Sequence, residues 1–293
     1  MEWGLDGWVL LEAGARWLVY LGSLFALGSA IFQLALPAGD RHLLGPMRAT
    51  VTGAALVGAL ASLSLISITA GKLLDDGIAG MLDPEWLGIV AGESLGTATG
   101  LRMLGLALVI VSVFVERLRT PLVIIGALGV AVSFARTGHS LDDPGGWSAV
   151  LVAGHLLGVA FWFGAIRPLH ALAGRAHGHA DAARIAERFG RQALWFVPGL
   201  MIIGVAIAWR LLGDPARLFD TDYGRMLLVK LILVGAVLGL GALNKLCMVP
   251  ALGAGKPRAA HAFRTVLRIE AAGFVAVFLA TALLTSATTL PGH

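Results

Sequence analysis

The sequence contains little charge and almost no cysteine. Charged residues make up 14% of its 293 residues, where a soluble domain carries roughly 25%, and hydrophobic residues make up 57%. A single cysteine excludes a disulfide framework and a metal site built from several cysteines. Because so much apolar surface cannot be hidden inside a globule of this size, we expect a polytopic membrane protein.

The sequence also lacks signatures of nucleotide-driven and hydrolytic enzymes. It contains no H-E-x-x-H or G-x-S-x-G motif, and Gly253-Ala254-Gly255-Lys256 lacks the frame of a phosphate-binding loop. The net charge of +4 does not indicate a nucleic-acid partner, because the basic residues are spread over short segments between apolar runs. We therefore expect a transporter-like membrane protein that is not an enzyme and binds no nucleic acid.

Eight apolar segments are each long enough to cross a bilayer as a helix, which takes about 20 residues. They predict an all-α bundle of eight transmembrane helices that forms a single membrane domain over residues 1–293. A cleavable signal peptide would carry basic residues before its apolar run, but here Glu2 and Asp6 come first. We therefore expect the first apolar run to be a transmembrane helix and not a signal peptide. The predicted spans are 8–36, 48–71, 95–116, 121–138, 147–169, 191–212, 224–249 and 266–290.

The connecting segments alternate in charge along the chain. The segments after the first, third, fifth and seventh spans hold 14 of the 22 basic residues, and the segments on the other side are acidic. Basic loops remain in the cytoplasm. The charge pattern therefore predicts that both termini are periplasmic, which an even number of spans also requires.

Several predicted spans contain ionisable side chains, which are costly in lipid and so indicate function. A helix rises about 1.5 Å per residue, which places most of them in the outer half of the membrane and predicts a polar vestibule open to the outside. The alternative is structural, because Glu12 and Arg16 can pair on one helix face. Arg16, Arg102 and Lys230 are expected to pair with carboxylates such as Glu12 or Glu93. The outer set comprises Glu12, Arg16, Arg102, Arg136, His139, His155 and Lys230.

His155 is the strongest candidate for a metal ligand, since a neutral imidazole in a span can bind copper or haem iron. His139 lies at the outer end of the preceding span, beside Asp142, and we expect the two imidazoles to converge. The alternative is a histidine that merely hydrogen-bonds a neighbouring helix. Two glycine pairs, Gly154 with Gly158 and Gly235 with Gly239, predict close helix approach.

Three stretches resemble the CopD family of copper-resistance membrane proteins. The first runs from His155 to Gly164 and includes Trp162. The second is Tyr223-Gly224 with Lys230, Ala242-Leu243-Asn244 and Pro250. The third is Arg268-Ile269-Glu270 with the apolar run that follows. The resemblance is strongest in the C-terminal half, and Lys245 stands where the family pattern has arginine.

The resemblance implies a bacterial inner-membrane protein of copper homeostasis that moves copper from the periplasm to the cytoplasm. It implies a periplasmic copper-binding partner of the CopC type. By carry-over, His155, Trp162, Lys230, Asn244 and Glu270 become candidate functional positions, while His139, His155 and Asp142 are the predicted metal site.

Two other functions fit the same residues. A surplus of positive charge in the outer half suits the propionates of a haem, with His155 and a second histidine as axial ligands of an electron-transfer protein. A membrane scaffold that docks a periplasmic copper carrier would bind its partner without moving copper.

The predicted orientation has a direct test in reporter fusions. Alkaline phosphatase joined to the C-terminus should be active, because that enzyme needs the oxidising periplasm. The same reporter inserted after Gly255, in a basic segment, should be inactive. Activity in the reverse pattern would show that the charge bias has been read with the wrong sign.

Overall fold

The computed structural model describes residues 6–44, 47–136 and 146–287, which are almost entirely helical. Within these residues, eight helices are long and apolar enough to cross a membrane, as the sequence predicts. The long helices are α1 (Gly7–Ala35), α2 (Arg48–Leu74), α5 (Ser94–Ser112), α6 (Arg119–Ala135), α7 (Trp147–Ala173), α8 (His179–Leu212), α10 (Asp222–Leu243) and α12 (Ala259–Ala287).

Short helical elements connect the long helices. They are η1 (Ala38–Leu44), α3 (Gly77–Leu82), α4 (Pro84–Gly92), η2 (Glu116–Leu118), α9 (Arg217–Asp220), η4 (Asn244–Met248) and α11 (Val249–Gly253). Side-chain caps fix several starts: Asp6 accepts from the Val9 N–H at 2.8 Å, and Thr221 accepts from the Gly224 N–H at 3.0 Å.

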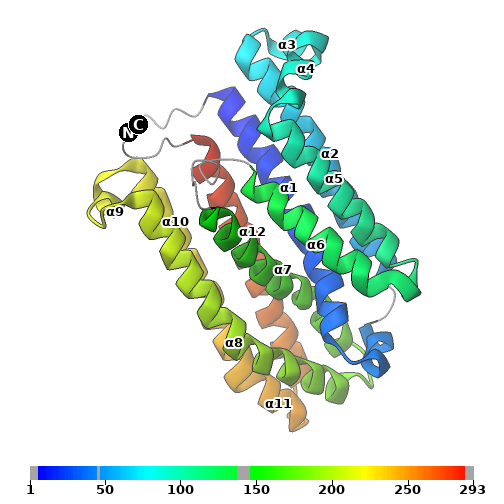
Figure 1. The fold of residues 1–293 in the computed structure, drawn as a ribbon. Coiled ribbons are helices and arrows are strands. Elements are labelled where there is room, and N and C mark those ends of the chain that lie inside the picture. The colour runs from blue at the N-terminus through cyan, green and yellow to red at the C-terminus, as the bar shows by residue number, and fades with distance from the viewer. Residues whose placement is uncertain (1–5, 45–46, 137–145, 288–293) are drawn as a thin grey trace.

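Helix α1 is the centre of the bundle. It packs against α2, α7, α12, α6 and α5. In Figure 1, α2, α5 and α6 lie on one side of α1, while α8 and α10 lie on the other, beyond α7 and α12. The core that surrounds α1 holds its fully buried Leu24, Leu27 and Phe32. Helices α8 and α10 bury little of their own surface, so most of it is left for lipid.

Glycine allows α1 to meet its neighbours backbone to backbone. A Cβ on Gly28 would collide with the backbone of Ala160 in α7, and one on Gly164 would collide with Gly28 and Ser29. On the other side of α1, a Cβ on Gly22 would collide with Gly58 of α2. These contacts are the small-residue packing expected between helices in lipid.

The structure differs from the sequence predictions at some helix ends. Helix α8 begins at His179, not near 191, because Ala182, Ile185 and Ala186 form a buried stripe that continues the helix. Helix α12 begins at Ala259, ahead of the predicted 266. Two short helices, α3 and α4, occupy the segment 72–94, which was predicted to be a connection.

The two predicted glycine contacts have opposite outcomes. Gly158 does pack against α8, since a Cβ there would lie 3.0 Å from Leu200 side-chain atoms. The prediction for Gly235 and Gly239 is wrong, because within the described residues nothing lies within 4 Å of a Cβ on either. The reason is that α10 is packed mainly against α12 and leaves this face of α10 open.

The α1–α7 contact predicts a large penalty for Gly164→Leu. The added side chain must displace the α1 backbone at Gly28, and overpacking of this kind costs about 1–3 kcal/mol or more. Thermal unfolding of the purified protein in detergent should therefore shift to lower temperature. Gly100→Ala is the matched control, since nothing lies within 4 Å of its added Cβ. Equal stability of the two variants would contradict the close approach.

Candidate functional site

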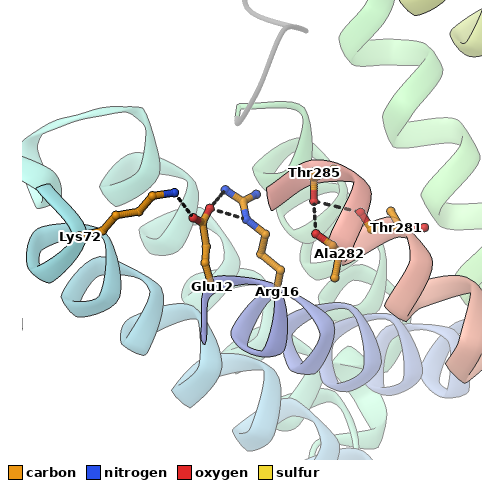
Figure 2. A network of polar contacts seen from close by, with 6 residues as sticks. All are labelled: Glu12, Arg16, Lys72, Thr281, Ala282 and Thr285. Atoms are coloured by element: carbon orange, nitrogen blue, oxygen red, sulfur yellow. Dashed lines mark hydrogen bonds and ion pairs between the residues drawn. The ribbon is translucent and has the colours of Figure 1, made fainter. Parts of the chain in front are cut away.

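The buried Glu12 carboxylate of α1 binds two cations at once. Its Oε1 accepts from Arg16 Nε at 2.9 Å and Nη2 at 2.7 Å, and its Oε2 accepts from Lys72 Nζ of α2 at 2.9 Å. Figure 2 shows the carboxylate between them, while Thr285 of α12 donates to carbonyls of its own helix. The predicted pairing of Glu12 with Arg16 is confirmed. Lys72 was missed, because only the register of α2 against α1 brings it there.

Arg102 of α5 is buried without a carboxylate partner among the described residues, contrary to the prediction that Glu12 or Glu93 would pair with it. It is only 3% exposed, and it donates to Ser133 Oγ of α6 at 3.1 Å and Ser62 Oγ of α2 at 3.2 Å. Its guanidinium lies 4.2 Å from the centre of the Phe134 ring. Hydroxyl groups and a ring face can stabilise a guanidinium where no carboxylate is in reach.

These contacts divide the predicted outer vestibule. Glu12, Arg16 and Arg102 lie among α1, α2, α5 and α6, where they join helices. His155 and Lys230 belong to α7 and α10, on the other side of α1. Glu12 and Arg102 thus contact neighbouring helices, as the structural alternative predicts, while the vestibule stays a prediction.

His155 faces α8 from the N-terminal half of α7, which is the predicted outer half. A Cβ on Gly204 would lie 3.5 Å from the imidazole Cε1, so the glycine leaves room for the ring. The imidazole reaches the backbone of Leu200 and lies within electrostatic range of Lys230. Its buried Nδ1 has no hydrogen-bond partner among the described residues. One ring nitrogen is therefore free to accept a ligand.

The other two members of the predicted metal site, His139 and Asp142, lie outside the described residues. Within the part of the chain that the structure describes, no group of three His, Cys, Asp or Glu side chains could hold a metal ion. The convergence of His139 with His155 stays a prediction.

Three residues singled out by the sequence meet deep inside the bundle. Trp162 Nε1 of α7 donates to Glu270 Oε1 of α12 at 2.5 Å, and Asn244 Nδ2 donates to Glu270 Oε2 at 2.6 Å. Glu270 is 2% exposed and Asn244 is 7% exposed. We call these three side chains the Glu270 triad. The sequence named its members separately, and the structure joins them.

The local chain geometry explains how Asn244 reaches Glu270. Asn244 begins η4, a single π-helical turn between α10 and α11. Pro250 follows and cannot donate the backbone hydrogen bond of a regular helix, so it favours a widened turn before it. π-Helical turns are rare and are frequently found at functional sites.

Aromatic rings and a glycine hold Trp162 in place. Its ring contacts Phe274 at 5.7 Å and Phe196 at 6.3 Å between centroids, both edge to face. A Cβ on Gly241 would lie 2.6 Å from Trp162 Cζ2, so only glycine leaves space for the indole on this side. The indole N–H is thereby aimed at Glu270 in apolar surroundings.

A half-open groove of about 620 Å³ lies between α8 and the η4–α11 segment. Arg184, Glu187, Arg191 and Lys245 supply its charged groups. Lys245 donates from Nζ to the Gly190 carbonyl at 2.8 Å and so bridges η4 to α8. This end of the bundle is the predicted cytoplasmic end.

The same end carries an ion pair between Asp40 of η1 and α8. Arg184 Nη1 lies 2.8 Å from Asp40 Oδ2, and Arg184 Nη2 lies 2.9 Å from Asp181 Oδ1. The hydrogen bond from Arg184 lowers the pKa of the Asp40 carboxyl below its usual value. The carboxylate therefore stays ionised near neutral pH and ties η1 to the extended start of α8.

Two family models match the chain. The model described as "Copper resistance protein D-like, N-terminal domain" matches residues 8–149, and the model described as "Copper resistance protein D" matches residues 183–284. The chain belongs to the copper resistance protein D family. The first match contains Glu12, Arg16 and Arg102, and the second contains Lys230, Asn244 and Glu270. Helix α7, with His155 and Trp162, lies mostly between the two matches.

Curated relatives of this family align over most of the chain. It is 28% identical over 261 residues to "Copper resistance protein D" of Pseudomonas syringae pv. tomato, covering 82% of this chain and 83% of the relative. It is 25% identical over 272 residues to "Inner membrane protein YebZ" of Escherichia coli (strain K12), covering 90% and 91%. No solved structure matches it significantly. The chain is a multi-pass inner-membrane copper resistance protein of this family.

The Glu270 triad predicts that Trp162→Phe destabilises the protein although it keeps an aromatic ring. The variant removes one of two donors to a buried carboxylate, and a hydrogen bond to a charged group contributes about 1.5–3 kcal/mol. The measurement is thermal unfolding in detergent. The control is Trp195→Phe, at a side chain that is 86% exposed. A Trp162→Phe protein as stable as the control would argue against the hydrogen bond.

Proposed function

We propose that this copper resistance protein moves copper from the periplasm to the cytoplasm and that His155 is a ligand on the way. The proposal is carried by one observation, a buried imidazole Nδ1 that has no hydrogen-bond partner among the described residues, inside a span of a chain from a copper resistance family. Imidazole nitrogen is a favoured ligand for copper. His139 and Asp142, predicted at the outer mouth of α7, would receive the ion before His155 does.

The positive charge of Lys230 near His155 favours a site that releases copper over one that retains it. Lys230 is close enough to weaken the hold of His155 on a cation. A conducting site needs binding that is strong enough for entry and weak enough for release. A negative interior drives a cation inward by about 2.3 kcal/mol per charge per 100 mV. Asn244 of the Glu270 triad and Lys245, which lines the groove, are adjacent on η4, and this supports a path between α7, α8, α10 and α12.

A periplasmic copper-binding protein of the CopC type is the proposed donor. It would present copper to the outer mouth near Asp142, so that free copper never needs to accumulate outside. This step and the direction of movement are parts of the proposal that family membership supports only in general terms.

The test is copper uptake into liposomes that contain the purified protein and carry an inside-negative potential. His155→Ala should lower uptake at least about tenfold, the range seen when groups around a metal are lost. His261→Ala is the matched control, an exposed histidine at the start of α12. Uptake by His155→Ala equal to that of the unaltered protein would overturn the assignment of His155.

Two further readouts separate the alternatives. A Soret absorption band in the purified protein would favour the haem-binding function, and metal analysis would show whether copper or iron copurifies. Tight binding of a copper-loaded periplasmic carrier without uptake of copper would favour the docking scaffold.

A further inference from the structure

The Glu270 carboxyl group is buried inside the bundle, with no cation beside it among the described residues. It is 11 residues into the 29-residue helix α12, about 16 Å from its start by the rise of a helix. Within the described residues it forms no ion pair, unlike Glu12, which binds both Arg16 and Lys72. An isolated carboxylate at such a depth is costly, and it becomes much cheaper when it is protonated.

Among the described residues, no charged side chain on the helices packed against α12 forms an ion pair with Glu270. Among the described residues, the side chains that hydrogen-bond to its carboxyl group are Trp162 and Asn244. Lys245, next to Asn244 in the chain, donates to Gly190 instead. The other titratable groups on the elements packed against α12, and on α12 itself, are Glu12, Arg16, Tyr20, His155, Arg167, His170, Asp222, Tyr223, Arg225, Lys230, Cys247, His261, Arg264 and Arg268.

Asn244 is suited to serve both protonation states of Glu270. In the structure its Nδ2 donates to Glu270 Oε2, as an ionised carboxylate requires. Its buried Oδ1 has no hydrogen-bond partner among the described residues. The two ends of an amide have nearly the same shape, so half a turn about the last side-chain bond exchanges donor and acceptor. Oδ1 would then accept the O–H of a protonated Glu270.

We propose that the Glu270 triad is a proton-binding site, at which Glu270 takes up and releases one proton while the Asn244 amide turns to match. Uptake forms an O–H bond at Oε2 with a proton from water, and release returns that proton to water. Trp162 keeps its hydrogen bond to Oε1 in both states. Asn244 begins the π-helical turn, so the amide that turns when Glu270 is protonated lies at the irregular junction of α10 and α11.

Coupling of this proton to copper rests on the proposed function. If a proton and a copper ion move through the same side of the bundle alternately, the movement of one would be coupled to the movement of the other. The proton site itself does not depend on copper, because its evidence is the geometry of three side chains.

Infrared difference spectroscopy on the full chain in liposomes tests the site without copper. A change of pH should raise or remove the C=O stretching band of one protonated carboxyl group in dry surroundings. Glu270→Gln should abolish this band, and Glu12→Gln, at the paired carboxylate, should retain it. Asn244→Leu keeps the carboxyl group but removes its amide partner, so the band should change frequency.

The outcomes separate the two proposals. The absence at every pH of a band that Glu270→Gln removes would overturn the proton site, and so would a band that Asn244→Leu leaves unmoved. If the Glu270→Gln protein fails to fold, Asn244→Leu alone decides. A titrating band in a protein whose copper uptake survives His155→Ala would support the proton site while overturning the copper ligand.

Discussion

The cost of charge in lipid governs this bundle. Three buried ionic groups are stabilised in three different ways: Glu12 by two cations, Arg102 by two hydroxyls and an aromatic ring, and Glu270 by two neutral N–H donors. The contacts of Glu12 and Arg102 join different helices near α1 and so fix how those helices pack. The third gives the carboxylate no compensating cation among the described residues, and so it leaves a group that can change its protonation state.

The two sides of α1 accordingly differ in character. On the side of α2, α5 and α6, Glu12 and Arg102 have partners on neighbouring helices, and the backbones of Gly22 and Gly58 meet. On the side of α7, α8, α10 and α12, polar atoms of His155 and Asn244 lack partners within the described residues, and the outermost helices bury little surface. Unsatisfied buried polar atoms are uncommon in proteins, and a functional role, a bound water or an ion can explain them. Ser23 of α1 and Thr52 of α2 also have such an atom.

Properties of the chain that depend on local sequence were predictable, while properties that depend on helix register were not. The eight spans follow from the length of the apolar runs, and the Glu12–Arg16 pair follows from a spacing of four on one helix. Lys72, Ser62 and Ser133 could not be foreseen, because they reach their partners only through the packing of different helices. The family resemblance named Trp162, Asn244 and Glu270, but only the crossing of α7, α10 and α12 makes them one site. His139 and Asp142 lie outside the described residues, so the metal site predicted there stays a prediction.

The crossing of α1 and α7 at Gly28 and Gly164 has a consequence for motion. Two backbones in direct contact cannot slide past each other, since each would meet the other's carbonyl groups. Helix α8, by contrast, meets α7 through the flexible side chain of Leu200 on Gly158, a contact that tolerates small shear. A small shift of α8 against α7 therefore disturbs fewer backbone contacts than the same shift of α7 against α1.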